Sequence, residues 1–289
     1  TCLLLLGMTT FAQDANFHIY LCLGQSNMEG NAKVEEQDTV AVDSRFQVLA
    51  AVDCPNLGRI KGNWYKAVPP LARCYTGLTP GDYFGRAMVA NLPSNVRVGI
   101  INVAVGGCRI ELFDKDNYQS YVETSPDWLK NMVKEYGGNP YARLVEMAKL
   151  AQKDGVIKGI LLHQGESNTN DKDWPLKVKG VYDNLLNDLG LSAANVPLLA
   201  GEVVHADQNG VCASMNTIID SLPQVIPTAH VISSAGCPAA FDNLHFTAEG
   251  YRMLGARYAA KMLSILGYGD WTSAQNMKLW YNRPAQDWL

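Results

Sequence analysis

The sequence predicts an α/β protein, a three-layer αβα sandwich around a central five-stranded parallel sheet. Short apolar runs rich in β-branched residues alternate with longer segments of helical periodicity, which is typical of βαβ units. The runs GIINVAV and IKGILLH are apolar almost throughout, as expected for strands that helices cover on both faces. The chain of 289 residues, 47% of them hydrophobic, is long enough to bury one large core without a metal or a disulfide.

Five segments are expected to form the strands, and five others to form helices. The strands are expected at Phe17–Gly24, Arg97–Ala104, Val156–His163, Val196–Val203 and His230–Ser234. The helices are expected at Asp82–Leu92, Tyr141–Lys153, Leu176–Leu189, Met215–Leu222 and Ala248–Leu266. Two long segments, 31–80 and 109–139, do not fit this alternation. Insertions of this length are usually functional loops, and the alternative is that their aromatic residues form small cores beneath the loops.

Both ends of the chain are expected to lie outside the domain proper. The N-terminus reads TCLLLLGMTTFAQDA, where an apolar run followed by small residues resembles the end of a secretory signal peptide. The run is too short to span a bilayer. The alternative to a signal peptide is an apolar strand. We therefore expect a signal peptide remnant at 1–12, one domain at 13–269, and a tail at 270–289 that packs on the domain or begins a linker. A secreted or periplasmic protein is expected, and a longer precursor could carry additional domains.

The charge and the cysteines limit the partners. The formal net charge of −4 gives no basic excess to attract nucleic acid or anionic lipid, so the expected partner is small or neutral, with no membrane contact after signal removal. No cysteine or histidine spacing suggests zinc, so no metal is expected.

Export would permit disulfides. Cys54 and Cys74 lie in one irregular segment and are expected to be bridged. Cys212 and Cys237 are a second candidate pair, because they follow strands expected to be neighbours. Cys22, in the middle of a strand, is expected to stay a buried free thiol.

Four polar or glycine-rich stretches follow expected strands, where an open parallel sheet binds its ligands. GQSNMEG follows the first strand, VGGCRIELF the second and HQGESN the third, and FDNLHFTAEGY comes after the last. Each stretch alone is explained by a turn or a helix cap. Together they supply a hydroxyl, a histidine, a carboxylate and several donors, which are the parts of an acyl-transfer site.

Ser26 is the candidate nucleophile, and a helix cap is the alternative role for it. A serine hydroxyl needs a base, and among the five histidines only His245 has an aspartate three residues before it and a helix after it. In this spacing Asp242 can hold the tautomer of the imidazole. Three further residues are candidates for substrate contact: Gln25, His163 and His205.

GQSNM, the GG turn, HQGESN and the late Asp-x-x-His resemble, in this order, the blocks of SGNH/GDSL-type hydrolases, more narrowly carbohydrate esterase family 6 and the sialate O-acetylesterase-like domains. The general pattern has GDS in the first block and an asparagine two places after the glycine of the third, where this chain has Gln25 and Ser167. The resemblance implies an SGNH hydrolase-like fold. It also implies an oxyanion hole built from the backbone N–H groups of Ser26 and Gly107 with the side-chain amide of Gln164 or Asn168. Glu166 either orients His245 in place of Asp242 or supports the third loop by hydrogen bonding.

The expected function is that of a secreted serine esterase that removes acetyl groups from acetylated polysaccharide such as xylan, through an acyl-enzyme and without a cofactor. The alternative substrate is O-acetylated sialic acid. A non-catalytic carbohydrate-binding module is a further alternative, which the joint presence of Ser26, Asp242 and His245 argues against.

Overall fold

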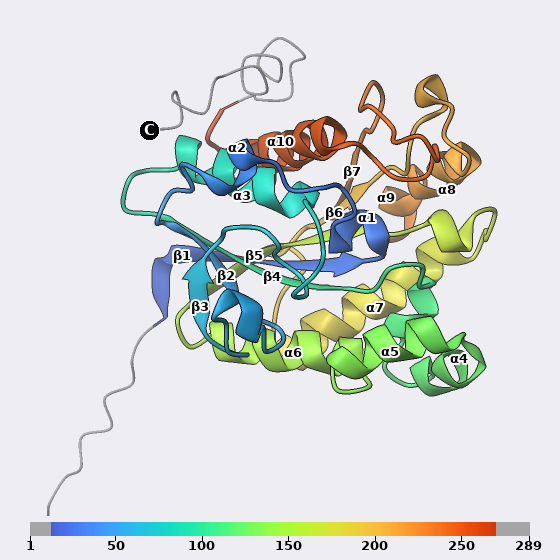
Figure 1. The fold of residues 1–289 in the computed structure, drawn as a ribbon, viewed down its shortest axis with the longest axis horizontal. Helices are drawn as coiled ribbons and strands as arrows, with labels where there is room; N and C mark the ends of the chain where they lie inside the picture. The colour runs from blue at the N-terminus through green and yellow to red at the C-terminus, as the bar shows by residue number, and fades with distance from the viewer. Residues whose placement is uncertain (1–12, 270–289) are drawn as a thin grey trace, which may run out of the picture.

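In the computed structural model, which describes residues 13–269, a seven-stranded sheet forms the middle layer of an α/β fold (Figure 1). The strand order is β3-β2-β4-β1-β5-β6-β7, and every neighbouring pair is parallel except β2 with β3. The strands are β1 (Asp14–Gly24), β2 (Phe46–Leu49), β3 (Trp64–Lys66), β4 (Arg97–Ala104), β5 (Gly155–His163), β6 (Leu198–Gly201) and β7 (Ala229–Ile232). The predicted three-layer α/β architecture is confirmed, whereas the expected signal peptide remnant and C-terminal tail lie outside the described residues.

The predicted number of strands is too low by two. The five expected strands correspond to β1, β4, β5, β6 and β7, and the two additional ones lie in the segment 31–80. β2 has four residues and β3 has three, and β3 is an antiparallel edge strand whose side chains are only partly buried. Neither therefore carries the apolar run by which a buried strand is recognised in a sequence.

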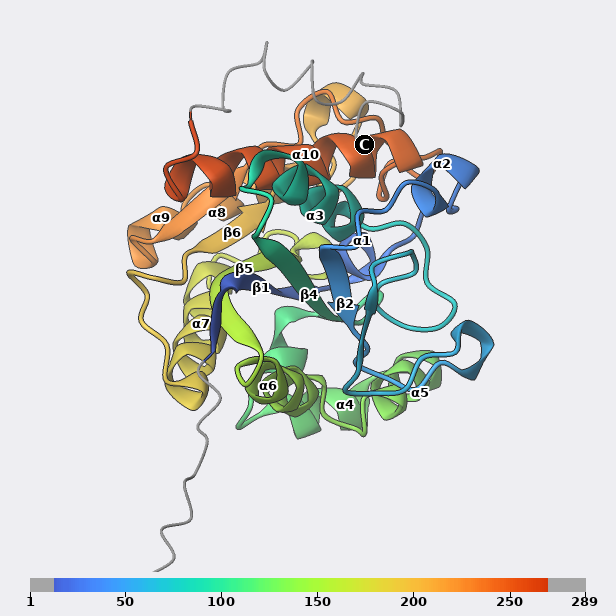
Figure 2. The ribbon, with the colours of Figure 1, turned by 90° about the vertical axis from the view of Figure 1, so that its left-hand side faces the viewer.

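Helices cover both faces of the sheet (Figures 1 and 2). α3 (Pro80–Asn91) and α10 (Ala248–Ile265) pack on one face, and α6 (Pro140–Ala151) and α7 (Trp174–Leu189) pack on the other. α3 and α10 approach closely: a Cβ added at Gly255 would lie 2.3 Å from the carbonyl oxygen of Pro80. The side chains of β1 alternate between the two layers, with Ile19 in one core and Tyr20 in the other, so both faces of the strand are buried.

The predicted helix Met215–Leu222 is instead two short helices, α8 (Asn216–Ile219) and α9 (Leu222–Val225). Pro223 has no N–H to donate to the preceding turn, which a continuous helix would require. The other helices are α1 (Ser26–Glu29), α2 (Glu36–Thr39), α4 (Tyr118–Thr124) and α5 (Asp127–Glu135), with 3-10 turns η1 (Pro55–Leu57), η2 (Ile110–Phe113), η3 (Glu166–Asn168), η4 (Ala206–Gln208) and η5 (Ala213–Met215). Among the described helices, none combines the length and the hydropathy needed to cross a membrane.

The strand register brings three loops to one edge of the sheet. Gly24, the last residue of β1, pairs with Ala104 of β4 on one side and with His163 of β5 on the other. The loops after these strands therefore begin side by side, although 80 and then 59 residues separate their starting points (24 to 104, 104 to 163).

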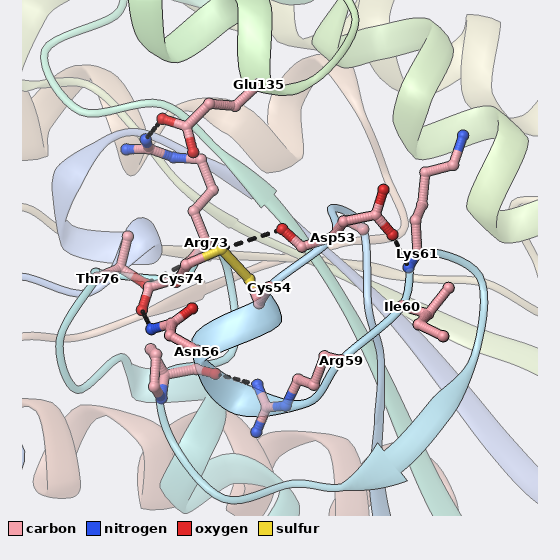
Figure 3. The surroundings of a disulfide bond; sticks show 12 residues. Asp53, Cys54, Asn56, Arg59, Ile60, Lys61, Arg73, Cys74, Thr76 and Glu135 are labelled. Carbon is pink, nitrogen blue, oxygen red and sulfur yellow. Dashed lines mark hydrogen bonds and ion pairs between the residues drawn. A yellow bond between two sulfur atoms is a disulfide. The ribbon is translucent and has the colours of Figure 1, made fainter.

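The structure supports one of the two expected disulfides. Cys54 and Cys74 are bridged, as predicted (Figure 3), and Cys22 is a buried free thiol. The expected pairing of Cys212 with Cys237 is wrong, because both thiols are free. Cys212 packs against the core beneath α6 and α7, whereas Cys237 belongs to the core beneath α3 and α10.

Replacing both Cys54 and Cys74 by alanine is expected to lower the free energy of unfolding by about 3 kcal/mol, because the bridge restricts the unfolded chain across a short loop. The measurement is urea unfolding of the oxidised protein. Cys212→Ala, which removes a free thiol, is the matched control and should lower the free energy of unfolding by less than about 1 kcal/mol. Equal stability of the double variant and the wild type would contradict a structural role for the bridge.

Candidate active site

A tight turn after β1 presents Ser26 at the edge of the sheet. Gly24 has a φ of +150°, and a Cβ there would lie 2.0 Å from the carbonyl oxygen of His163, so only glycine fits. The N–H of Gln25 donates to the same carbonyl oxygen at 3.0 Å, which fixes the turn to β5. Ser26 then begins α1 and is 9% exposed.

Ser26, His245 and Asp242 form one hydrogen-bonded chain. The Nε2 atom of His245 lies 2.8 Å from the Oγ atom of Ser26, and its Nδ1 atom lies 2.7 Å from the Oδ2 atom of Asp242. The other carboxylate oxygen of Asp242 accepts the N–H groups of Leu244 and His245, each at 3.0 Å. The carboxylate is thus held on the loop that carries the imidazole, as the three-residue spacing predicts.

The surroundings of Asp242 favour its ionised form. Burial opposes the charge, but the backbone N–H and the imidazole of His245 donate to the carboxylate and hold the pKa of Asp242 below its ordinary value. The group facing the imidazole is therefore an anion at neutral pH.

Asn27 joins the turn that carries Ser26 to the loop that carries His245. Its side-chain amide is buried and donates to the carbonyl oxygen of Leu244 at 3.0 Å, while its Oδ1 atom accepts the N–H of Phe246 at 3.4 Å. The two groups belong to the residues directly before and after His245 in the chain. The hydroxyl of Tyr251, in α10, also donates to Oδ1 at 2.6 Å. Asn27 therefore fixes the backbone on which the imidazole depends.

Glu166 supports Asn27 and does not contact His245. The carboxylate of Glu166 accepts the side-chain N–H of Asn27, and it lies 3.8 Å from the Nδ1 atom of the buried His163. The sequence left open whether Asp242 or Glu166 faces the imidazole of His245. In the structure Asp242 has this position, and Glu166 has the alternative position beside the first loop.

Two backbone N–H groups at or near the nucleophile have no acceptor among residues 13–269. Within residues 13–269, neither the N–H of Ser26 nor that of Gly107 donates a hydrogen bond to the protein. The loop of Gly107 is held from both sides: Glu29 accepts the N–H of Gly106 at 3.1 Å, and the carbonyl oxygen of Gly107 accepts the hydroxyl of Ser167 at 3.0 Å. Gly107 has a φ of +70°, and a Cβ there would lie 2.6 Å from the ring of Trp128, which covers this glycine.

The two predicted side-chain amides are used elsewhere. Gln164 donates to Gln25, Asn168 and the carbonyl oxygen of Cys108, and its own oxygen accepts the indole N–H of Trp174. The amide nitrogen of Asn168 donates to the carboxylates of Glu111 and Asp171 at 3.0 and 3.1 Å. Neither amide has a hydrogen left for a substrate oxygen, so the structure does not support Gln164 or Asn168 as an oxyanion donor.

Two of the three candidates for substrate contact, Gln25 and His163, are buried. Gln25 is 2% exposed, and its oxygen accepts the N–H groups of Gly165 and Ser167, so it ties the first loop to the third. His163 is fully buried, and burial lowers its pKa below the ordinary value. His205 is partly exposed and lies 3.3 Å from the carboxylate of Asp207. The structure therefore does not support Gln25 or His163 as substrate contacts, whereas the prediction for His205 stays a prediction.

Three residues of the site were not predicted as such from the sequence: Asn27, Glu29 and Trp128. Asn27 and Glu29 stand in GQSNMEG itself, but their partners lie far along the chain, 139 residues away for Asn27 and Glu166. No spacing in the sequence marks such a pair. Among the described residues, no group of three or more histidine, cysteine, aspartate or glutamate side chains could hold a metal ion.

A hydroxyl beside an imidazole, an anion behind the imidazole and two free N–H groups are suited to acyl transfer. Comparison with known proteins agrees with this chemistry. A family model described as "Carbohydrate esterase, sialic acid-specific acetylesterase" matches residues 16–264. A probable carbohydrate esterase of Arabidopsis thaliana is 25% identical over 264 residues, which cover 85% of this chain and 90% of that protein.

Solved structures share the fold. The crystal structure of the Arabidopsis thaliana protein has a TM-score of 0.66 at 21% identity and covers 87% of this chain and 99% of that one. The structure of NanS has a TM-score of 0.62 at 14% identity, covering 89% and 99%. A carbohydrate acetylesterase from Xanthomonas citri has a TM-score of 0.59 at 18% identity, covering 86% of this chain and 56% of that one.

Asn27→Ala is expected to lower the free energy of unfolding by about 1–3 kcal/mol, because it leaves the buried carboxylate of Glu166 and the carbonyl of Leu244 without their donor. Urea unfolding measures the change. Asn195→Ala, at an exposed asparagine, is the control and should leave the stability within about 0.5 kcal/mol of the wild type. If both variants were equally stable, Asn27 would not hold the loops together.

Proposed function

The chain belongs to the carbohydrate esterase, sialic acid-specific acetylesterase family, and we propose that it releases acetate from acetylated plant polysaccharide such as xylan through an acyl-enzyme on Ser26. The members of this family are carbohydrate esterases, so the protein is an enzyme and not a binding module without activity. The proposal concerns the polysaccharide and the mechanism. The single observation that carries the mechanism is the hydrogen-bonded chain from Ser26 through His245 to Asp242.

In the proposed mechanism, the Nε2 atom of His245 takes the proton of the Ser26 hydroxyl while the Oγ atom attacks the acetyl carbonyl carbon. The carbonyl oxygen becomes negative and accepts the free N–H groups of Ser26 and Gly107. One preorganised donor of this kind stabilises the transition state by about 3 kcal/mol. His245 then gives its proton to the leaving sugar oxygen, and the carbon–oxygen bond to the sugar breaks.

The second half of the reaction repeats these steps with water. His245 takes a proton from a water molecule, whose oxygen attacks the acetyl group on Ser26, and the imidazole returns this proton to the Oγ atom as acetate leaves. Each half passes through an imidazolium cation. The ionised Asp242, 2.7 Å from the Nδ1 atom, stabilises that cation and keeps the imidazole in the tautomer that presents a free Nε2 atom to Ser26.

Exposed aromatic rings near the mouth of the site support a sugar substrate. Phe241 is 100% exposed and directly precedes Asp242, and Trp128 is 54% exposed beside Gly107. Sugar rings have apolar C–H faces that pack on such rings, while their hydroxyl groups stay in water.

The apolar cavity between β1, β5, β6 and α7 is too small for a long acyl chain. The cavity lined by Leu23, Ile110 and Leu162 measures about 10 Å³, which is no more than the space of one water molecule. A long acyl chain therefore finds no channel there.

We further propose a secreted or periplasmic location. The Cys54–Cys74 bridge supports it, because disulfides form and persist in oxidising compartments.

O-acetylated sialic acid is the second candidate substrate, favoured by the description of the matched family. Acetate release from acetylated xylan and from O-acetyl sialic acid, at equal ester concentration, separates the two. We expect xylan to give the higher kcat/KM, and Ser26→Ala to remove both activities. A higher kcat/KM for the sialate would replace the xylan proposal, and a wild type inactive on both would overturn the proposed function.

Asp242→Asn is expected to reduce kcat by a factor on the order of 10⁴, because an amide holds the imidazole in the wrong tautomer. Glu166→Gln should cost far less, since the glutamine keeps an oxygen that can accept the amide N–H of Asn27. Acetate release is measured for both variants, with the free energy of unfolding as the control for folding. A larger loss in Glu166→Gln than in an equally stable Asp242→Asn would reverse the two roles.

A further inference from the structure

We propose that a groove beside the nucleophile turn binds a sugar residue that neighbours the acetylated one in an oligosaccharide or polysaccharide chain. This inference rests on the proposed function and extends it from an acetylated sugar to a glycan chain. The groove has a volume of about 880 Å³, within the range of about 300–1,000 Å³ of ligand sites. Residues 29–34, Arg73, residues 75–77 and Glu135 line it.

The groove begins one helical turn after the nucleophile. α1 runs from Ser26 to Glu29, and Glu29 forms part of the groove wall. Gly106 contacts both residues: a Cβ added there would lie 3.8 Å from the Cβ atom of Ser26 and 2.9 Å from a carboxylate oxygen of Glu29. A chain whose acetylated residue lies at Ser26 can therefore continue into the groove with the adjoining residue.

The walls of the groove are held in place. The N–H of Gly77 donates to the carbonyl oxygen of Gly30, and that of Leu78 to Ala32, both at 2.7 Å. Figure 3 shows Arg73 next to the disulfide, with its guanidinium toward Glu135. The same guanidinium pairs with Glu29, so it joins the two walls. A wall held in this way loses little conformational entropy when a ligand binds.

Tyr75 presents an aromatic ring on this fixed wall. The residue follows the bridged Cys74 and is 89% exposed. Among the described residues, its hydroxyl has no hydrogen-bond partner, and neither does the amine of Lys33, an exposed residue that also lines the groove. An exposed ring with unused polar groups beside it suits a sugar, whose C–H face packs on the ring and whose hydroxyl groups accept and donate hydrogen bonds.

The charges of the groove argue against the other ligand classes of this size. Arg73 is paired with two carboxylates, so Lys33 is the one unpaired cation among the described lining residues. A nucleic acid or a phosphorylated ligand needs several such groups. An apolar ligand would exclude water from the charged groups of Glu29, Glu135 and Arg73 without offering them a hydrogen-bond partner.

The test compares one acetylated sugar with the same sugar in a chain. The pairs are acetylated xylose with singly acetylated xylotetraose, and O-acetyl sialic acid with O-acetyl sialyllactose, so that either glycan source is detected. In one of the two pairs, we expect the wild-type kcat/KM to be about tenfold higher for the oligosaccharide than for the single sugar. Tyr75→Ala should bring this ratio near one. Tyr75→Phe, which keeps the ring, and Leu176→Ala, an exposed residue on α7, should preserve it.

Calorimetry with xylotetraose and with sialyllactose, neither of them acetylated, measures the groove without turnover. Tyr75→Ala should weaken binding of one of these glycans about tenfold. A ratio that Tyr75→Ala leaves unchanged, together with unchanged binding, would overturn the groove as a sugar site while the esterase function stands. A wild type that binds the glycan through Tyr75 but releases no acetate would support the groove and overturn the proposed function.

Discussion

The site depends on the hydrogen bonds of one buried side chain, the carboxamide of Asn27. Ser26 and His245 are 219 residues apart in the chain, and within residues 13–269 no backbone hydrogen bond joins their loops directly. Asn27 does so by donating to Glu166 and Leu244 and by accepting from Phe246 and Tyr251. Four partners use the amide fully, so any movement of one loop leaves a buried polar group unpaired, at a cost of about 1–3 kcal/mol. A change in the distance between the hydroxyl of Ser26 and the imidazole of His245 would therefore also lower the stability of the fold.

A second buried network holds the opposite side of the nucleophile. Glu29 and Arg73 are both about one-tenth exposed, and the carboxylate also accepts the N–H of Gly106. Burying a charge is tolerated only when partners and hydrogen bonds compensate it. Here the hydrogen bond from Gly106 to Glu29 fixes the position of Gly106, and with it that of the free N–H of Gly107. The position of His245 therefore depends on the amide of Asn27, and the position of Gly107 depends on the ion pair of Glu29 with Arg73.

The sequence predicts the parts of this protein that depend on local pattern. The central strands are apolar almost throughout, so their parallel arrangement and the edge at which Ser26 and His245 meet follow from composition and order. The short strands β2 and β3 carry no such run and were not predicted. The direction of an amide is also not a local property: the partners of Gln164 and Asn168, among them Trp174 and Glu111, come from segments elsewhere in the chain. A sequence motif can identify such a residue, but it does not predict the hydrogen-bond partners of its side chain.

The bridge between Cys54 and Cys74 holds the wall of the groove together from within. This wall belongs to an insertion at the edge of the sheet, and the bridge ties the insertion to itself rather than to the central strands. It is also tied to the turn that carries Ser26, by the ion pair of Arg73 with Glu29, by the hydrogen bond from Gly77 to Gly30 and by the contact of Ala32 with Leu78. Residues of the wall that make none of these contacts, such as Tyr75, can therefore be exchanged without moving Ser26, His245 or Asp242. One esterase core can in this way be combined with groove walls of different shape.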